Sequence, residues 1–199
     1  MDGAGSTRRR LFAAVALPET VRRHLADAVE QVRTAAVEPT GTGRAGAVRW
    51  TDPASWHLTL AFYGAVAGAE YALLQATLDR LAARHRPLQL ALGGAGRFGQ
   101  RVLWAGVTGN RSAVLALAAS TAEAGRIAGI GPAEDRPYHP HLTVARGGPG
   151  ADLSGAAAAL DGYAGPAWRV EELVLVESQL GQGPGGTAMH VAVRAFSLG

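Results

Sequence analysis

The sequence predicts an α+β fold: a duplicated, two-lobed arrangement of mostly antiparallel sheets around a central cleft, with helices on the outside. Strand-like segments are interleaved with helix-like ones, but many strands follow one another through glycine-rich turns, which favours hairpins over parallel crossovers. Each half of the chain also contains a strand that carries a His-x-Thr sequence, followed by a helix and two further strands. Such a repeat predicts that equivalent strands lie side by side about a pseudo-two-fold axis.

The individual elements follow from hydrophobic periodicity and from the residues that interrupt it. Pro18 suits a first helical turn, and apolar residues then recur every three to four positions, which predicts an amphipathic helix to about Ala36. We expect residues 1–8 to form a flexible tail and residues 9–199 to form a single two-lobed domain. In chain order, the predicted elements are 9–17 (strand), 18–36 (helix), 38–47 (loop), 48–50 (strand), 57–64 (strand), 70–84 (helix), 87–93 and 101–108 (strands), 111–127 (helix), 129–137 (loop), 141–146 (strand), 152–161 (helix), 168–178 and 188–197 (strands).

The composition is that of a folded chain with a weak preference for anionic partners. Hydrophobic residues make up 48% of the sequence and charged residues 18%, which argues against disorder. There is no cysteine, so disulfides and thiolate metal sites are excluded. All 19 basic residues are arginine and the net charge is +3; the guanidinium fork matches phosphate oxygens. No apolar run reaches the roughly 18 residues of a membrane span, and we expect a cytoplasmic monomer.

Three segments imitate other functional signals. Arg8–Leu17 resembles the start of a signal peptide, but Pro18 follows at once and no Ala-x-Ala site appears, so a first core strand is favoured. Gly94–Gly99 and Gly181–Gly186 have the spacing of a dinucleotide-binding fingerprint. That fingerprint requires a helix directly after the glycines, whereas a predicted strand follows each run here. We therefore interpret both runs as hairpin connections.

A His-x-His sequence raises the alternative of a metal site. His139 and His141 could bind a metal, but the only nearby third ligands are Glu134 and Asp135, in a loop before a proline. We therefore expect no metal and no cofactor, and we interpret His139 as a residue held in extended geometry by Pro140. The histidines without any surrounding motif, expected to be surface or partly buried residues, are His24, His85 and His190.

Two matching tetrapeptides carry the chemistry: residues 57–60 read His-Leu-Thr-Leu and residues 141–144 read His-Leu-Thr-Val. In a strand, residues i and i+2 face the same side, so each motif places its histidine beside its threonine. The apolar residues on the opposite face, which we expect in the core, are Leu58, Leu60, Phe62, Leu142 and Val144. A repeated imidazole and hydroxyl pair indicates a site rather than a stability device.

These motifs resemble those of the two-histidine (2H) phosphoesterases, in particular the bacterial and archaeal RNA 2′,3′-cyclic phosphodiesterases once called 2′-5′ RNA ligases. The resemblance covers nearly the whole chain from about residue 9. It departs in the glycine-rich stretch 181–186 and at Met189-His190, where the family often has an aromatic residue. Further segments that fit are 10–15, 56–64, 101–107, 140–146 and 173–178.

The resemblance implies metal-independent hydrolysis of RNA ends, or of nucleoside 2′,3′-cyclic phosphates, to 2′-phosphomonoesters. His57 would protonate the leaving 3′ oxygen and His141 would orient or deprotonate water, although the residues alone leave the reverse assignment open. A histidine suits either role because its pKa lies near ~6.5. The hydroxyls of Thr59 and Thr143 would bind the phosphate. The alternatives are reversible 2′-5′ RNA ligation and a catalytically idle RNA-end binding module.

Four further residues are candidates for contacts to the substrate. Arg146 matches the phosphate-binding arginine of the family, but strict alternation places it on the face opposite His141. It therefore reaches the phosphate only if the strand ends or bulges near Ala145. The candidates for stacking on a base are Tyr63, Phe98 and Tyr138.

Overall fold

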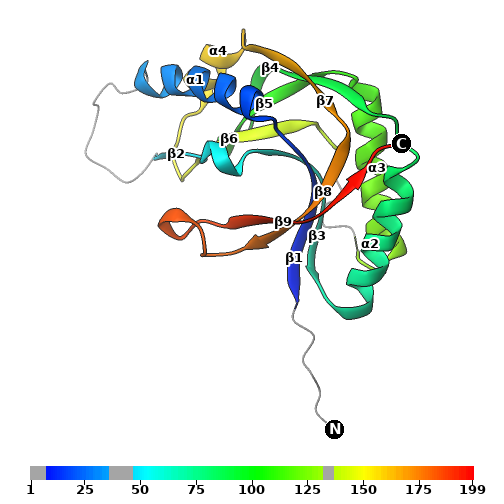
Figure 1. Cartoon of the computed structure of the whole chain (residues 1–199). Helices are drawn as coiled ribbons and strands as arrows, with labels where there is room; N and C mark the ends of the chain where they lie inside the picture. Colours follow the sequence, from blue (N-terminus) through cyan, green and yellow to red (C-terminus); the bar gives the residue numbers. More distant parts are fainter. Residues whose placement is uncertain (1–7, 36–46, 132–136) are drawn as a thin grey trace.

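The computed structural model describes residues 8–35, 47–131 and 137–199 (Figure 1). The predicted tail up to residue 7, the predicted loop up to residue 46 and residues 132–136 of the second predicted loop lie outside the described residues. The elements are β1 (Arg9–Ala16), α1 (Glu19–Ala35), β2 (Val48–Trp50), η1 (Pro53–Ser55), β3 (His57–Val66), α2 (Gly68–Ala82), β4 (Leu88–Phe98), β5 (Val102–Gly109), α3 (Arg111–Ile127), β6 (His141–Gly147), α4 (Ser154–Leu160), β7 (Ala164–Val170), β8 (Glu172–Gln179), η2 (Pro184–Gly186) and β9 (Met189–Ser197).

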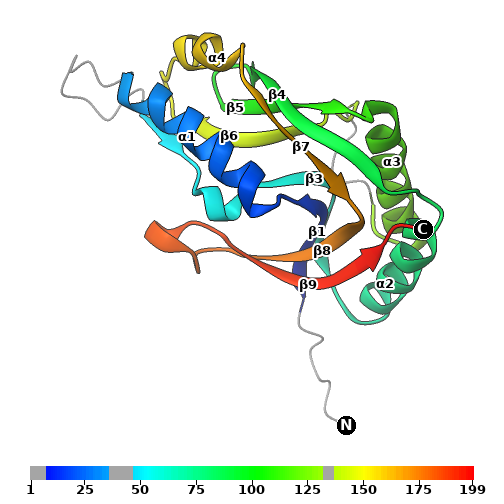
Figure 2. The same cartoon turned by 45° about the horizontal axis from the view of Figure 1, so that its top comes forward.

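The strands form two antiparallel sheets, which confirms the predicted fold class. One sheet has the order β3-β1-β8-β9 and the other β2-β6-β5-β4-β7, and every pairing between neighbours is antiparallel. Each sheet takes strands from both halves of the chain, so the lobes are intertwined. Helices α2 and α3 pack together beside the sheets, and α1 and α4 lie at the other end of the molecule (Figures 1 and 2). None of the described helices combines the length and apolarity needed to cross a membrane.

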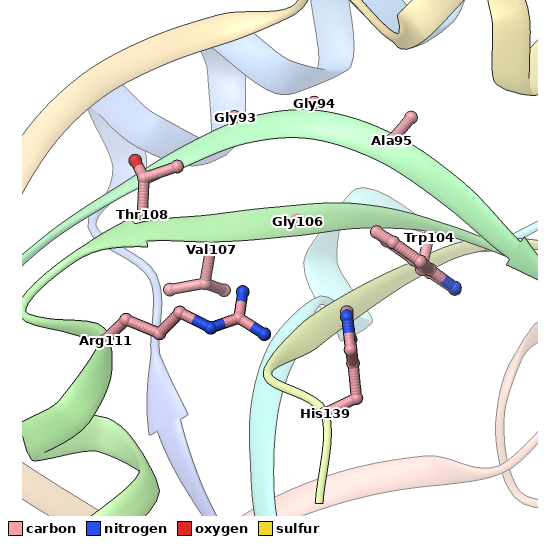
Figure 3. Close-up of a pocket in the computed structure, with 9 residues that line it drawn as sticks. All are labelled: Gly93, Gly94, Ala95, Trp104, Gly106, Val107, Thr108, Arg111 and His139. Atoms are coloured by element: carbon pink, nitrogen blue, oxygen red, sulfur yellow. The ribbon is translucent and has the colours of Figure 1, made fainter.

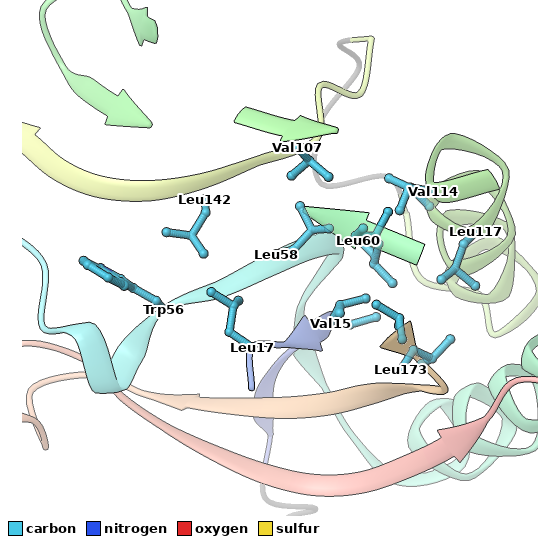
Figure 4. Close-up of a cluster of buried hydrophobic side chains, with 14 of the residues drawn as sticks. Val15, Leu17, Trp56, Leu58, Leu60, Val107, Val114, Leu117, Leu142 and Leu173 are labelled. Atoms are coloured by element: carbon cyan, nitrogen blue, oxygen red, sulfur yellow. The ribbon is translucent and has the colours of Figure 1, made fainter. Parts of the chain in front are cut away.

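One large apolar core joins the two sheets. It takes side chains from β1, β3, β5, β6 and β8 and from helices α1, α2 and α3 (Figure 4). Leu58, Leu60, Leu142 and Val144 are buried in it, as the alternation predicted. Burial of this apolar surface stabilises the packing of the two sheets by about 25 cal/mol for each Å² removed from water. The opposite faces of β3 and β6 bear the histidines.

The prediction of a single strand over 168–178 was wrong, because the structure divides this segment into two strands at Glu171. The part before the break, β7, pairs with β4 in the five-stranded sheet, and the part after it, β8, pairs with β1 in the four-stranded sheet. The hydrophobic pattern continues through the break because both parts contribute to the same core. Local periodicity reports burial and does not report which neighbour supplies the hydrogen bonds.

The two glycine runs have different outcomes. The run Gly181–Gly186 connects β8 to β9, as predicted. The run Gly94–Gly99 was wrongly interpreted as a connection, because β4 continues to Phe98 and only the last residue of the run lies in the turn. The register of β4 against β5 shifts between Leu92 and Ala95, and Gly94 has φ +67°, which favours glycine. A strand follows both runs, so neither has the helix that a dinucleotide fingerprint requires.

Candidate active site

The two histidine motifs lie side by side, where the two sheets meet. His57 begins β3 and His141 begins β6, and these two strands contact each other. Two hydrogen-bond links join the motifs. The Tyr138 hydroxyl, three residues before His141, donates to the carbonyl of Thr59 at 2.8 Å.

The second link runs in the opposite direction. The indole Nε1–H of Trp56, directly before His57, donates to the Thr51 hydroxyl at 2.7 Å. That hydroxyl lies 3.0 Å from the carbonyl oxygen of Thr143 and 2.9 Å from that of Val144, and it donates to this pair. Each motif is therefore fixed to the threonine region of the other.

Both histidines have the same local geometry. Nδ1–H of His57 donates to the carbonyl of Ser55 at 2.7 Å, and Nδ1–H of His141 donates to the carbonyl of His139 at 2.7 Å. In each case the acceptor is two residues upstream. A carbonyl accepts only, so Nδ1 carries the proton and the neutral ring has its lone pair on Nε2. The fold thus holds both rings in one tautomer, with the proton on Nδ1.

A β-bulge after Thr143 decides where Arg146 lies. Thr143 pairs with Trp104, and Ala145 pairs with the adjacent Leu103, so Val144 is an extra residue without a partner position in β5. Val144 and Ala145 are consequently buried in succession, and the alternation changes phase. Arg146 then lies on the same face as His141, which is the geometry that its predicted role required. We use the name histidine face for this surface of β3 and β6, which bears both histidines and both motif threonines.

The same bulge follows the first motif. Thr59 pairs with Ala14 and Ala61 pairs with Ala13, which leaves Leu60 as the extra residue. The phase change moves Phe62 onto the histidine face, where it is 46% exposed, so its predicted place in the core was wrong. Phe62 and Arg146 thus occupy equivalent positions, five residues after the histidines of the two repeats.

Aromatic rings surround His57. Phe12 of β1 stacks on it, with ring centroids 4.6 Å apart and planes inclined by 29°. The His190 ring of β9 meets it edge-on at 5.0 Å. Phe62 lies 5.7 Å from Phe12. His190 belongs to the site rather than to an unrelated part of the surface; the family tendency for an aromatic residue at this position was the only signal for it.

A second group of rings surrounds His141. Phe98 lies edge-on at 4.9 Å, and Trp104 and His139 lie at 6.5 Å and 6.3 Å. Phe98 is 42% exposed, so its ring presents a surface on which a base can stack. Trp104 was not singled out by the sequence, since its proximity depends on its pairing with Thr143 across the two strands.

Of the other two stacking candidates, Tyr63 is a correction. Tyr63 is only 5% exposed, and its hydroxyl donates to the carbonyl of Thr121 on α3 at 2.9 Å. It is a bulge residue of β3 that points into the core, so no base reaches its ring. Tyr138 packs against the same core and its hydroxyl is occupied by the link to Thr59, which makes it a connection between the sheets. Two histidines without a motif are exposed or partly buried, as predicted: His24 is exposed and bonds Tyr163, and His85 is partly buried and bonds Ser120.

The electrostatics of the site suit an anion. Burial is the main cause that lowers the pKa of His57 to about 4. The hydrogen bond to the Ser55 carbonyl raises this pKa, and the positive charges of His190, His141 and Arg146 lower it further. The charged groups that act on His57 are thus all cationic. Burial also lowers the pKa of His139, with smaller contributions from Arg111 and His141. A bound phosphate would offset these repulsions.

A metal site has no support within the described ranges. No three His, Cys, Asp or Glu side chains gather there in a metal-binding cluster. Glu134 and Asp135, the third ligands considered with His139 and His141, lie outside those ranges. The structure instead gives the His139 carbonyl a defined use, as the acceptor for His141.

Comparison with known proteins identifies the fold and the family. A crystal structure of E. coli LigT in apo form superposes with a TM-score of 0.72 over 97% of this chain and 99% of that chain, at 24% identity. A Bacillus subtilis (strain 168) protein named RNA 2′,3′-cyclic phosphodiesterase is 30% identical over 149 residues, which is 73% of this chain and 75% of that protein. A Geobacillus stearothermophilus protein of the same name is 36% identical over 101 residues, 49% of this chain.

The chain spans 32% of the length of the Geobacillus stearothermophilus relative. The family model described as the 2′-5′ RNA ligase superfamily matches residues 21–182, which include both histidine motifs. This chain therefore belongs to the 2′-5′ RNA ligase superfamily.

Proposed function

We propose that this chain hydrolyses 2′,3′-cyclic phosphates at RNA ends to 2′-phosphomonoesters, without a metal, through an acid–base pair of His57 and His141. The observation that carries the proposal is the matched preparation of the two rings. Each donates Nδ1–H to a carbonyl two residues upstream, so each neutral ring has its proton on Nδ1 and its lone pair on Nε2. Two histidines in one tautomer on adjacent strands suit a reaction that removes one proton and supplies another.

In the proposed reaction, one histidine takes a proton from water and the other gives a proton to the leaving oxygen. His141 Nε2 removes a proton from water while the water oxygen attacks phosphorus. The bond between phosphorus and the 3′ oxygen breaks, and His57 Nε2–H protonates that oxygen. The product carries a 2′-phosphate and a 3′-hydroxyl, and the net consumption is one water. Solvent exchange returns each histidine to its starting protonation state. The family resemblance supports this assignment of acid and base.

The threonines and Arg146 would stabilise the charge that develops on phosphate. Thr59 and Thr143 share the histidine face with the two rings, and the bulge at Val144 brings Arg146 to that face. Hydroxyl and guanidinium donors fixed before the reaction stabilise a pentacoordinate phosphate without reorganisation. The relatives named RNA 2′,3′-cyclic phosphodiesterase support the same substrate class.

The test is an assay of product identity. We expect a nucleoside 2′,3′-cyclic phosphate and an RNA with a cyclic-phosphate end to give only the 2′-phosphomonoester, at the same rate with and without excess EDTA. A deoxy phosphodiester should be inert, because it cannot form the strained cyclic ester. Loss of turnover on chelation, restored by one divalent ion, would contradict metal independence. Binding of the cyclic end without turnover would identify the idle binding module instead.

The pH dependence of kcat/KM should be bell-shaped with an unusually low acid limb. One histidine must be neutral and the other protonated, so activity falls when both are protonated and when both are neutral. Because burial and cationic neighbours lower the pKa of His57 to about 4 in the free protein, the pair binds its second proton only in that range, and the acid form of His57 is a minority state until a bound phosphate offsets these repulsions. The acid limb therefore lies near pH 4 and belongs to the coupled pair.

The measurement is kcat/KM on a nucleoside 2′,3′-cyclic phosphate from about pH 3.5 to 9. His190→Gln supplies the control, because it removes one of the cations that lower the pKa of His57. The acid limb of this variant should move to higher pH. A flat profile, or an acid limb at the ordinary histidine value in the parent protein, would contradict the proposed state of the pair.

A further inference from the structure

A pocket of about 240 Å³ lies on the five-stranded sheet, with His139 in its lining (Figure 3). Its lining includes three glycines, Trp104, Thr108, Arg111 and His139. Its volume is below the roughly 300–1,000 Å³ of sites for drug-sized molecules, so it accommodates one small planar group with a substituent. The proposed hydrolysis of a cyclic phosphate at the two histidines does not use this pocket.

The floor of the pocket is peptide backbone. Gly93 and Gly94 of β4 and Gly106 of β5 leave this part of the sheet without side chains. A Cβ on Gly106 would lie 2.6 Å from the carbonyl oxygen of Gly93, so the strands can approach this closely only with glycine. A flat ligand can therefore lie directly on the sheet at this point.

The pocket lies next to the strand position of His141. Gly106 pairs with His141 across β5 and β6. The rings of Trp104 and His139 lie 4.8 Å apart at the boundary, and His139 lies 6.3 Å from His141. A ligand with one group between the two histidines can thus place its next group in the pocket, against the indole of Trp104.

Arg111 supplies a positive charge at the far end. It is the exposed first residue of α3, and its guanidinium extends toward the His139 ring (Figure 3). Within the described ranges Arg111 has no ion pair with a carboxylate. A cation beside a flat floor and an indole suits an aromatic base that carries a phosphate.

We propose that this pocket binds the nucleotide adjacent to the cyclic-phosphate end, with its base over Gly93, Gly94 and Gly106 against Trp104 and its phosphate at Arg111. The proposal rests on the proposed function, and it adds a binding site for the second nucleotide, so an RNA end of at least two nucleotides is a better substrate than a mononucleoside cyclic phosphate. The cyclic phosphate lies between the histidines and the preceding nucleotide follows the sheet past His139.

The test compares a dinucleotide ending in a 2′,3′-cyclic phosphate with the matching mononucleoside 2′,3′-cyclic phosphate. Base stacking and one phosphate contact should raise kcat/KM for the dinucleotide by about 10–100-fold. Arg111→Gln should lower the dinucleotide value about tenfold and leave hydrolysis of the mononucleoside unchanged. It should also make the slope of log(kcat/KM) against log[salt] shallower by about 0.7 on the dinucleotide, because one phosphate contact is lost.

The matched control is Arg126→Gln, which removes an exposed arginine from the last turn of the same helix, about 22 Å away at 1.5 Å per residue. It should not change either substrate. Equal kcat/KM on both substrates, or an equal effect of both arginine variants, would overturn the pocket assignment while turnover of the mononucleoside stood. If neither substrate turned over, the proposed function itself would fail, and this outcome is distinct from failure of the pocket alone.

Discussion

His57→Ala and His141→Ala are each expected to lower kcat on a nucleoside 2′,3′-cyclic phosphate by about 10²–10⁴-fold, the usual contribution of a positioned acid or base. Each variant removes one Nε2 and leaves the other ring donating to its own carbonyl, so proton removal or proton supply is lost. Steady-state kinetics at the optimum of the parent protein measure the effect. The double variant should be little worse than either single one, because the two groups act as a unit.

The matched control for the histidine variants is His24→Ala. His24 is exposed on α1 and bonds Tyr163, away from the histidine face, so kcat should not change. Circular dichroism and Tm should show that all three variants keep the fold, since His57 and His141 lie outside the main apolar core. Near-normal turnover in either motif variant would remove that histidine from the mechanism.

Arg146→Met is expected to lower kcat by about 10²–10³-fold, the usual loss when one fixed donor to a transition-state oxyanion is removed. Methionine keeps the length and apolar stem of the side chain but removes the guanidinium. KM should change less than kcat, because the charge on phosphate increases in the transition state. Stopped assays on the same nucleoside substrate give both constants.

Two further measurements separate a role at phosphate from a structural role of Arg146. Arg146→Lys should recover only part of the activity, because lysine restores the charge without the bidentate fork. Loss of the guanidinium should also move the acid limb of kcat/KM to higher pH, since Arg146 lowers the pKa of His57. An Arg146→Met variant with unchanged kcat and an unchanged pH profile would show that this guanidinium does not reach the site.

The sequence identified the parts of the molecule whose signal is local. Helix α3 was predicted with the bounds found in the structure, because its apolar residues recur at the helical period and nothing interrupts them. Both His-x-Thr motifs could be recognised as strands with the histidine and threonine on one face, since a period of two fixes the relative direction of residues two apart. The family followed from the same two motifs.

The predictions that failed concern pairing partners and changes of phase. Phe62, predicted in the core, is exposed, and Tyr63, predicted at the substrate, is buried, because the extra residue Leu60 reverses the alternation in β3. The chain leaves one sheet for the other at Glu171 with no change in hydrophobicity. His190 reaches His57 only because β9 lies beside β8 in the four-stranded sheet. None of these features changes the local composition.

The sequence by itself therefore determined the family, the fold class, the strands that bear the two histidine motifs and the buried face behind them. Only the tertiary structure decided that Arg146 shares a face with His141, that Nδ1 of each ring is held by a carbonyl, and that glycines from β4 and β5 form a pocket floor beside Trp104. The physical reason is that periodicity records how deeply each residue is buried. Bulges, hydrogen-bond acceptors and pocket walls depend on which strands pair and in what register, and that choice is made by packing across the whole core.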